Sequence, residues 1–528
     1  MLLIDVSTSY FFRHWNAMGI LRTEHEVIRA FRDHLPGQGA GQAPVVFAIY
    51  HPTLRQYFRV DPAEMDSLLF DKSWEQPKPG RALDAISRPR ATARQLRFLR
   101  EIRALAAAGP DPTGTETEIG LARIAQDAAL AQQMQRISLG EYSRVRRWLS
   151  FAARLRPSLN SGISRLDQIN HLVHHGLFDA AAAQLFSRAN LIDPSAVRHY
   201  ISVGGFWSDD RYEMAYHARQ THGWTLHYLI YDLIPIKWRH ITEPTTKETF
   251  PLALHWMLWG VDQIWTISQT TKTDLLEYAS QSGYPDPDPD WVKPVYLGSE
   301  IPTPKADAET QAATLARYGL KPGGFVLMVG TLEPRKNHDF AYRLWKELNL
   351  RNPGQILPLV WVGQPGWAIA PLLEQVAQDH ELPHQAIHIL RDVSDADLDT
   401  LYRACRFTLY PSHYEGWGLP VVESLNYGKP CLASTAPAIV EAGQGVCETI
   451  GLFDGEAWIA RAQALMQDDA AYAEAVARIA RFTPCRWQDF RTTLVADYLA
   501  FCTSPRSRTG LAPAFHTPAS DAATGIQP

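Results

Sequence analysis

Two glutamates lie eight positions apart in the segment YPSHYEGWGLPVVESLNYGKPCLAS, residues 410–434. Glu415 lies in a loop with two glycines, and Glu423 lies in the first turn of a helix expected to start at Pro420. Carboxylates accept hydrogen bonds from vicinal hydroxyls, so the pair suits a ligand with both a sugar and a ribose. The alternative is that Glu423 caps its helix and Glu415 is solvated. The amides at the electropositive start of this helix belong to Gly416, Trp417, Gly418 and Leu419.

Two cations lie in a second loop, VGTLEPRKNHDF, residues 329–340. A strand is expected to end at Gly330, and Arg335 and Lys336 follow before the next helix. Cations at a helix start oppose the helix dipole unless an anion is bound there. Fixed cations stabilise the growing charge of a departing diphosphate more in the transition state than in the ground state. A solvated helix start with basic residues is the alternative.

Four further residues are candidates either for ligand binding or for a local structural role. Gly19, in an N-terminal loop, would allow close approach of the backbone, and Arg22 would add charge; a plain turn with a surface arginine is the alternative. Asp232 follows a strand-like run and would either position a hydroxyl group or turn the chain. Ser394 is suited to cap the helix that follows it.

The elements that must position these residues form two α/β units. Strand-like runs and helical patterns alternate in both halves, which predicts parallel sheets with helices on their faces. In such sheets ligands bind beyond the carboxyl ends of the strands. Expected strands lie in 2–7, 43–50, 199–207, 224–236, 261–268, 292–300, 325–332, 357–363, 385–390, 406–412 and 429–434. Expected helices lie in 22–31, 339–349, 370–380, 395–405, 420–428 and 487–502.

The predicted organisation is an N-terminal Rossmann-like domain (1–305), a second Rossmann-like domain (306–484), a C-terminal helix (485–502) and a disordered tail (503–528). A helical insertion is expected at about 80–198, because the strand–helix rhythm breaks there. It contains the basic amphipathic stretch RVRRWLSFAARLR, which would either contact an anionic membrane surface or pack on the protein with solvated arginines.

The composition limits the function. The chain has 528 residues and a formal net charge of −5, which argues against a general nucleic-acid binder. Five cysteines without a CxxC pair predict neither a disulfide framework nor a zinc site, and they favour a reducing compartment. The N-terminus does not resemble a signal peptide, and no apolar run is long enough for a membrane span. We therefore expect a cytoplasmic protein.

No metal or cofactor is predicted. The pairs Asp395/Asp397 and Asp286/Asp288 have the spacing of a metal-binding Asp-x-Asp pattern. The first lies at a helix start and the second in a proline-rich turn, so neither follows a strand as such a site requires. Basic residues and amide dipoles would then have to carry the charge of an anionic leaving group.

The segment P-S-x-x-E-G-x-G-L-P-x-x-E around Glu415 resembles the paired-glutamate signature of retaining glycosyltransferases with the GT-B fold, especially family 4 (glycosyltransferase group 1). The resemblance implies two facing Rossmann-like domains, with the acceptor side in 1–305 and the nucleotide-sugar site in 306–484, and a last helix (485–502) that crosses back to the first domain. It also implies that Glu415 faces the hydroxyls of the donor sugar and that Glu423 holds the ribose. It assigns the donor phosphates to Lys336 and Arg335, although Thr331 stands where many members have an arginine. Further donor-binding residues in this resemblance are Gly19, Arg22, Thr331, Val393 and Ser394.

The resemblance implies transfer of a sugar, for which mannose from GDP-mannose is the first guess, to a saccharide or lipid-linked glycan in polysaccharide biosynthesis. In the family Asp232 follows a histidine, which is Tyr231 in this chain. The mechanism that we expect is front-face substitution. It needs no dedicated protein base, because the departing phosphate helps to deprotonate the acceptor. The alternatives are an inactive relative that only binds a nucleotide sugar or glycan, and a phosphorylase or epimerase on the same fold.

Overall fold

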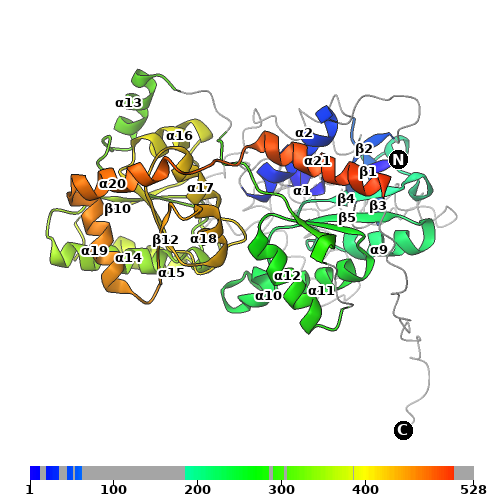
Figure 1. Cartoon of the computed structure of the whole chain (residues 1–528), viewed down its shortest axis with the longest axis horizontal. Helices are drawn as coiled ribbons and strands as arrows, with labels where there is room; N and C mark the ends of the chain where they lie inside the picture. The colour runs from blue at the N-terminus through cyan, green and yellow to red at the C-terminus, as the bar shows by residue number, and fades with distance from the viewer. Residues whose placement is uncertain are drawn as a thin grey trace, which may run out of the picture.

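The computed structural model describes residues 1–11, 19–34, 44–51, 54–61, 185–284, 289–301, 306–383 and 386–504 (Figure 1). Most of the expected helical insertion, the basic stretch 144–156, Asp286, Asp288 and the tail from 505 onward lie outside these residues. Within the described part of the chain, no helix is both long and apolar enough to cross a membrane.

The first sheet has seven strands in the order β3-β2-β1-β4-β5-β6-β7. All neighbouring pairs are parallel except β2 and β3, which form an antiparallel edge. Strand β1 pairs with β2 on one side and β4 on the other, so the order of the strands reverses at this point of the sheet. The strands are β1 (Leu2–Asp5), β2 (Val45–His51), β3 (Gln56–Arg59), β4 (His199–Ser202), β5 (Thr225–Ile230), β6 (Gln263–Thr266) and β7 (Val292–Pro294).

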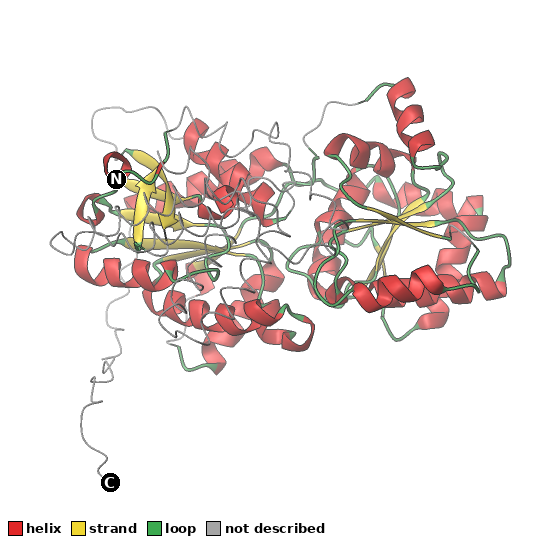
Figure 2. Cartoon of the chain, turned by 180° about the vertical axis from the view of Figure 1, so that it is seen from behind, coloured by secondary structure: helices red, strands yellow, loops and turns green. Residues whose placement is uncertain are grey.

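Helices cover both faces of this sheet (Figure 2), which explains why its strands are apolar on both sides. Leu2 and Ile4 of β1 pack into one core cluster, and Leu3 between them packs into the other. The helices of this domain are α1 (Ser7–Phe11), α2 (Ile20–His34), α9 (Arg211–His222), α10 (Ile234–Lys237), α11 (Pro244–Gly260) and α12 (Gln269–Gln281).

The second sheet has six parallel strands in the order β10-β9-β8-β11-β12-β13. Its strands are β8 (Val326–Val329), β9 (Leu359–Val362), β10 (Ile387–Leu390), β11 (Phe407–Tyr410), β12 (Cys431–Ser434) and β13 (Glu448–Ile450). Its helices are α13 (Ala308–Arg317), α14 (His338–Arg351), α15 (Ala370–Gln378), α16 (Asp395–Ala404), α17 (Leu419–Asn426), α18 (Pro437–Gly443), α19 (Gly455–Gln467) and α20 (Asp469–Ile479).

The last helix, α21 (Trp487–Thr503), leaves the second domain and lies on the first, where it packs beside α2 (Figure 1). Its Asp497 accepts hydrogen bonds from the Trp265 indole at 2.8 Å and from the Gln263 amide at 2.5 Å. Leu494 and Tyr498 join the same core cluster as β1. The chain therefore ties its two domains together at its C-terminal end as well as through the linker.

The prediction of two parallel-sheet α/β domains is confirmed. Several expected strands are shorter than their apolar runs. The run 224–236 divides into β5 and the short helix α10, because Asp232 accepts a hydrogen bond from the Ile234 amide at 3.0 Å and turns the chain. The run 199–207 ends as a strand at Ser202, before the glycines at 204 and 205.

Candidate active site

The loop from β11 to α17 carries Glu415 to the contact between the two domains. The backbone needs glycine at two places in this loop. Gly418 has φ of 109°, a left-handed conformation that favours glycine. A Cβ at Gly416 would lie 2.2 Å from the carbonyl oxygen of Tyr231, which follows β5 in the other domain. The carboxyl ends of the two sheets therefore meet here at backbone distance.

Glu415 is enclosed by cations from the second loop. Its Oε1 lies 2.7 Å from Nζ of Lys336, and its Oε2 lies 2.6 Å from Nη1 of Arg335. The Tyr410 hydroxyl, at the end of β11, donates to Oε1 at 2.9 Å and accepts from Lys336 at 2.5 Å. Glu415 is 6% exposed and Lys336 8%, so the alternatives in which these groups are solvated are wrong.

The electrostatics of this cluster follow from its pairing. Burial alone would raise the pKa of Glu415, but Arg335 and Lys336 outweigh it and lower the pKa to about 2. Burial is also the largest influence on Lys336 and lowers the pKa of its ammonium group, against the opposite effect of Glu415. Glu415 is therefore a carboxylate at neutral pH. It neutralises the positive charges of Arg335 and Lys336, which could also bind a phosphate.

Glu423 lies in a separate contact group, on the other side of the Gly416–Leu419 turn. Its Oε1 accepts from Arg22 Nη1 at 3.0 Å, across the two domains, and its Oε2 accepts from the Tyr402 hydroxyl at 2.8 Å. It does not cap its helix, whose first residues follow Gly418. The guanidinium of Arg22 is therefore held by the carboxylate of Glu423 in this structure.

Asp232 lies beside the Glu415 cluster from the opposite domain. Burial raises its pKa to about 6, and the charge of Glu415 adds to this, while Arg335 acts in the other direction. Tyr231, at the position of the family's histidine, donates its hydroxyl to the Val203 carbonyl at 2.6 Å. The tyrosine ring is therefore part of the core of its own domain and does not supply a base to this contact.

The remaining predicted residues lie at the ends of the expected elements. Gly19 has φ of 56° directly before α2, so the left-handed backbone explains the glycine. Ser394 accepts from the Asp397 amide at 3.1 Å, which confirms its role as a helix cap. Thr331 follows β8, and Val393 packs at the margin of a core cluster of the second domain. Trp417 is buried against the core of the first domain.

Residues 316–478 match the family model of the glycosyl transferases of group 1. The chain carries a group 1 glycosyltransferase domain. This domain contains both loops described above, with Lys336 and Arg335 in one and Glu415 in the other, and it also contains Glu423 of α17.

Curated relatives of the glycosyltransferase domain include two mannosyltransferases of Escherichia coli. The serotype-specific mannosyltransferase WbdA is 26% identical over 241 residues, which are 44% of this chain and 28% of that protein. The O-antigen chain mannosyltransferase B is 31% identical over 196 residues, 37% of this chain and 50% of that protein. A D-inositol 3-phosphate glycosyltransferase of Kineococcus radiotolerans is 30% identical over 210 residues, 37% of this chain and 48% of that protein. The chain thus spans half or less of these relatives.

A solved structure of Anabaena Alr3699/HepE in complex with UDP and glucose aligns with a TM-score of 0.46 and 14% identity. The alignment covers 58% of this chain and 79% of that one.

Sequence reasoning missed several residues that join the glycosyltransferase domain to the first domain. Thr271 of α12 donates to the Tyr231 carbonyl at 3.0 Å and to the Gly416 carbonyl at 3.3 Å. The carboxylate of Glu441, in α18, accepts from the amides of Gln269 at 2.7 Å and Thr270 at 2.9 Å, and so caps α12 across the interface. Within the glycosyltransferase domain, Tyr410 was also missed, although it had a usable signal, because it ends a strand immediately before the Glu415 loop.

The candidate metal residues do not form a site among the described residues, where no group of three His, Cys, Asp or Glu side chains could hold an ion. Asp395 and Asp397 lie in the first turn of α16. Asp397 pairs with Arg317 at 2.6 Å and accepts from the Tyr318 hydroxyl at 3.0 Å, so it is engaged with α13.

Proposed function

We propose that this chain is a retaining, metal-independent hexosyltransferase that moves a sugar, with mannose as the first candidate, from a nucleoside diphosphate sugar to a saccharide or lipid-linked glycan. The observation that carries the proposal is the pairing of Glu415 with Lys336 and Arg335 where the two sheet edges meet. The mannosyltransferase relatives support the choice of sugar and the setting in polysaccharide biosynthesis.

The proposed roles follow from charge. A donor diphosphate would compete with Glu415 for Lys336 and Arg335, and these cations would stabilise the leaving group as its charge grows. Glu415, released from one of its partners, would accept hydrogen bonds from the hydroxyls of the donor sugar. Glu423 would exchange Arg22 for the ribose, and Arg22 would turn toward the phosphates.

Two further features belong to this proposal. Asp232 would position the acceptor hydroxyl, and the departing phosphate would take its proton on the same face of the sugar. We place the reaction in the cytoplasm, with peripheral contact at the inner face of a membrane if the acceptor is lipid-linked. The basic stretch 144–156 is the sequence feature that favours such contact.

The test is a panel of GDP-, UDP- and dTDP-sugars assayed for nucleotide release, with wild type, Lys336→Ala and a control, Lys346→Ala. Lys346 lies on α14 and pairs with Asp379 at 3.1 Å and Glu381 at 2.6 Å, away from the Glu415 loop. We expect release to fall by roughly 10²- to 10³-fold in Lys336→Ala and to stay unchanged in the control. Equal release by Lys336→Ala and wild type from every active donor would refute the phosphate assignment. Binding of a donor without any release would favour the inactive relative.

A further inference from the structure

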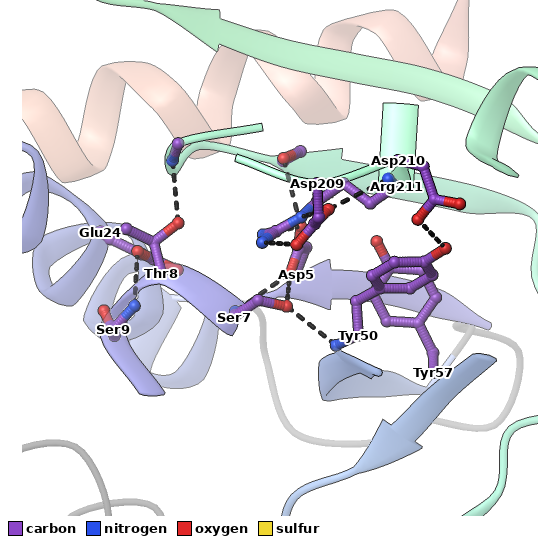
Figure 3. Close-up of polar contacts among 12 residues, drawn as sticks. Asp5, Ser7, Thr8, Ser9, Glu24, Tyr50, Tyr57, Asp209, Asp210 and Arg211 are labelled. Carbon is purple, nitrogen blue, oxygen red and sulfur yellow. Dashed lines mark hydrogen bonds and ion pairs between the residues drawn. The ribbon is translucent and has the colours of Figure 1, made fainter. Parts of the chain in front are cut away.

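A second group of polar side chains lies in the first domain, where β1 and β4 end (Figure 3). Glu24, from the first turns of α2, accepts a hydrogen bond through Oε2 from the backbone amide of Ser9 at 3.0 Å. The neighbouring Thr8 hydroxyl accepts from the Gly205 amide at 2.8 Å. A Cβ at Gly204 would lie 2.1 Å from that hydroxyl, so the loop after β4 is held tightly against α1. This is the edge at which a parallel sheet with a reversal of strand order binds ligands.

Two oxygens of this group have no hydrogen-bond partner among the described residues, although both are buried. They are Oε1 of Glu24 and Oγ of Ser9, and both residues are 0% exposed. Buried polar atoms in native proteins nearly always have a partner, because leaving one unpaired costs free energy. Since the Ser9 amide is bonded to Glu24, the two unpartnered groups are neighbours, and one ligand could satisfy both.

The cations at this edge are already used. Arg211 binds Asp5 at 3.1 Å and Asp209 at 2.5 Å, as Figure 3 shows. Arg55 binds Asp210 at 2.9 Å and Glu213 at 3.2 Å. An anionic ligand here would therefore face carboxylates, and the arginines beside them already pair with those carboxylates.

Glu24 itself favours a neutral ligand. Burial, and then the charge of Asp5, raise the pKa of Glu24 well above its usual value, with Arg211 acting the other way. A carboxylic acid donates one hydrogen bond and accepts others, which matches the hydroxyl of a sugar. The Ser9 hydroxyl has the same double capacity.

The group is also connected to the Glu415 loop. The Tyr231 hydroxyl donates to the Val203 carbonyl at 2.6 Å, and the next residue is Gly204, where a Cβ would lie 3.1 Å from Oε2 of Glu24. The carbonyl of Tyr231 is the atom that Gly416 approaches across the interface. Tyr231 thus connects the Glu24 group to Gly416, the residue that follows Glu415.

We propose that Ser9 and Glu24 form an acceptor subsite that binds two hydroxyls of an uncharged saccharide ring and excludes phosphorylated acceptors. This inference rests on the proposed transfer function and specifies its acceptor. Both oxygens are shielded from water in this structure, so the acceptor has to displace the side chains that cover them.

The test measures acceptor binding without a donor, by NMR titration with methyl mannoside, glucoside and galactoside and with their 6-phosphates. The variants are Ser9→Ala, Glu24→Leu and Glu24→Gln, with Glu26→Gln as the control. Glu26 lies on the same helix and pairs with Arg29 at 2.5 Å and with Arg491 of α21. Ser9→Ala is the cleanest variant, because it removes one hydroxyl and keeps the backbone amide that donates to Glu24. Thermal unfolding of each variant checks that it is folded.

At least one neutral glycoside should bind the wild type, and its phosphate should bind at least about tenfold more weakly. Loss of one hydrogen bond should weaken binding about three- to tenfold in Ser9→Ala and at least as much in Glu24→Leu. Glu24→Gln, whose amide also donates and accepts, and Glu26→Gln should bind as the wild type does. Unchanged binding by Ser9→Ala and Glu24→Leu, equal binding of a phosphate, or no binding of any neutral glycoside would overturn the inference. Nucleotide release assayed on the same samples separates this failure from failure of the transfer function.

Discussion

Two buried glutamates, Glu415 and Glu24, approach the domain interface from opposite sides, and their surroundings give them different protonation states. Burial pushes both toward the neutral acid. Glu415 has two cations within 2.7 Å and stays ionised, with a pKa of about 2. The cations near Glu24 are bound to other carboxylates, and its pKa rises well above the usual value.

The difference shows how one fold can provide two kinds of ligand site. Each sheet ends at the interface in a loop and a helix start, so the backbone frame is similar in both domains. The second domain places its cations against its own carboxylate, where a diphosphate can replace it. The first domain uses its arginines internally and leaves neutral hydrogen-bonding groups, which suit hydroxyls. The comparison predicts that the two edges respond in opposite ways to the same substitution.

The largest effect is expected from Glu415→Gln. The amide cannot neutralise Arg335 and Lys336, and it removes the proposed contact to the donor sugar. We expect kcat/KM for nucleotide release to fall by about 10²-fold or more, and the fold to lose roughly 3–5 kcal/mol because a buried ion pair is broken. Kinetics and urea unfolding should be measured together, with Glu347→Gln as the control, since Glu347 pairs with Arg351 on the exposed face of α14. Activity within tenfold of wild type would show that an ionised Glu415 is not needed for the reaction.

An intermediate effect is expected from Gly416→Ala, which tests whether the two edges must touch. The added Cβ would lie 2.2 Å from the Tyr231 carbonyl oxygen and 3.0 Å from Cβ of Asp232, so the domains cannot approach as closely. We expect about a tenfold or larger loss of kcat/KM, and a larger radius of gyration in small-angle scattering. Gly451→Ala is the matched control, because its Cβ would meet nothing within 4 Å. Wild-type kinetics in Gly416→Ala would mean that this contact is not needed for the reaction.

The parts that sequence reasoning predicted are those with a local signal. Apolar runs located the strands, and Ser394 was predicted as a helix cap from its position alone. Gly416 and Gly418 marked the loop that approaches another group closely, and a Cβ at Gly416 would lie 2.2 Å from the carbonyl oxygen of Tyr231 in the other domain. The edge strand β3 was missed, because four residues with a mixed pattern give no clear periodicity.

The parts that could not be predicted depend on contacts between distant segments. Arg22 and Glu423 are 401 positions apart, and Glu441 caps a helix 171 positions before it. No local pattern encodes such pairs, since they follow from how the domains dock. The polar group at Glu24 was missed for the same reason: Ser9 and Glu24 are ordinary residues until the fold leaves their oxygens unpaired.

The smallest effect is a difference in pH dependence, and it compares the two glutamates directly. The folded pKa of Glu24 lies above the unfolded value of about 4.3. Between these values the folded chain holds an extra proton, so wild-type stability falls as the pH rises through this window. Glutamine does not titrate. The free energy of unfolding of Glu24→Gln relative to wild type should therefore rise from pH 4 upward, by about 1.4 kcal/mol per pH unit within the window.

The sign is reversed for Glu415, whose folded pKa of about 2 lies below the unfolded value. Its contribution to stability is complete above the unfolded pKa and is lost as the pH falls toward 2, so the deficit of Glu415→Gln should shrink on acidification. Urea unfolding followed by circular dichroism, from pH 3 to pH 8, measures both variants against wild type. Parallel profiles would show that the two carboxyls share one protonation state. Diverging profiles would tie each edge to its own ligand, because only an ionised Glu415 competes with a diphosphate and only a neutral Glu24 can donate to a hydroxyl.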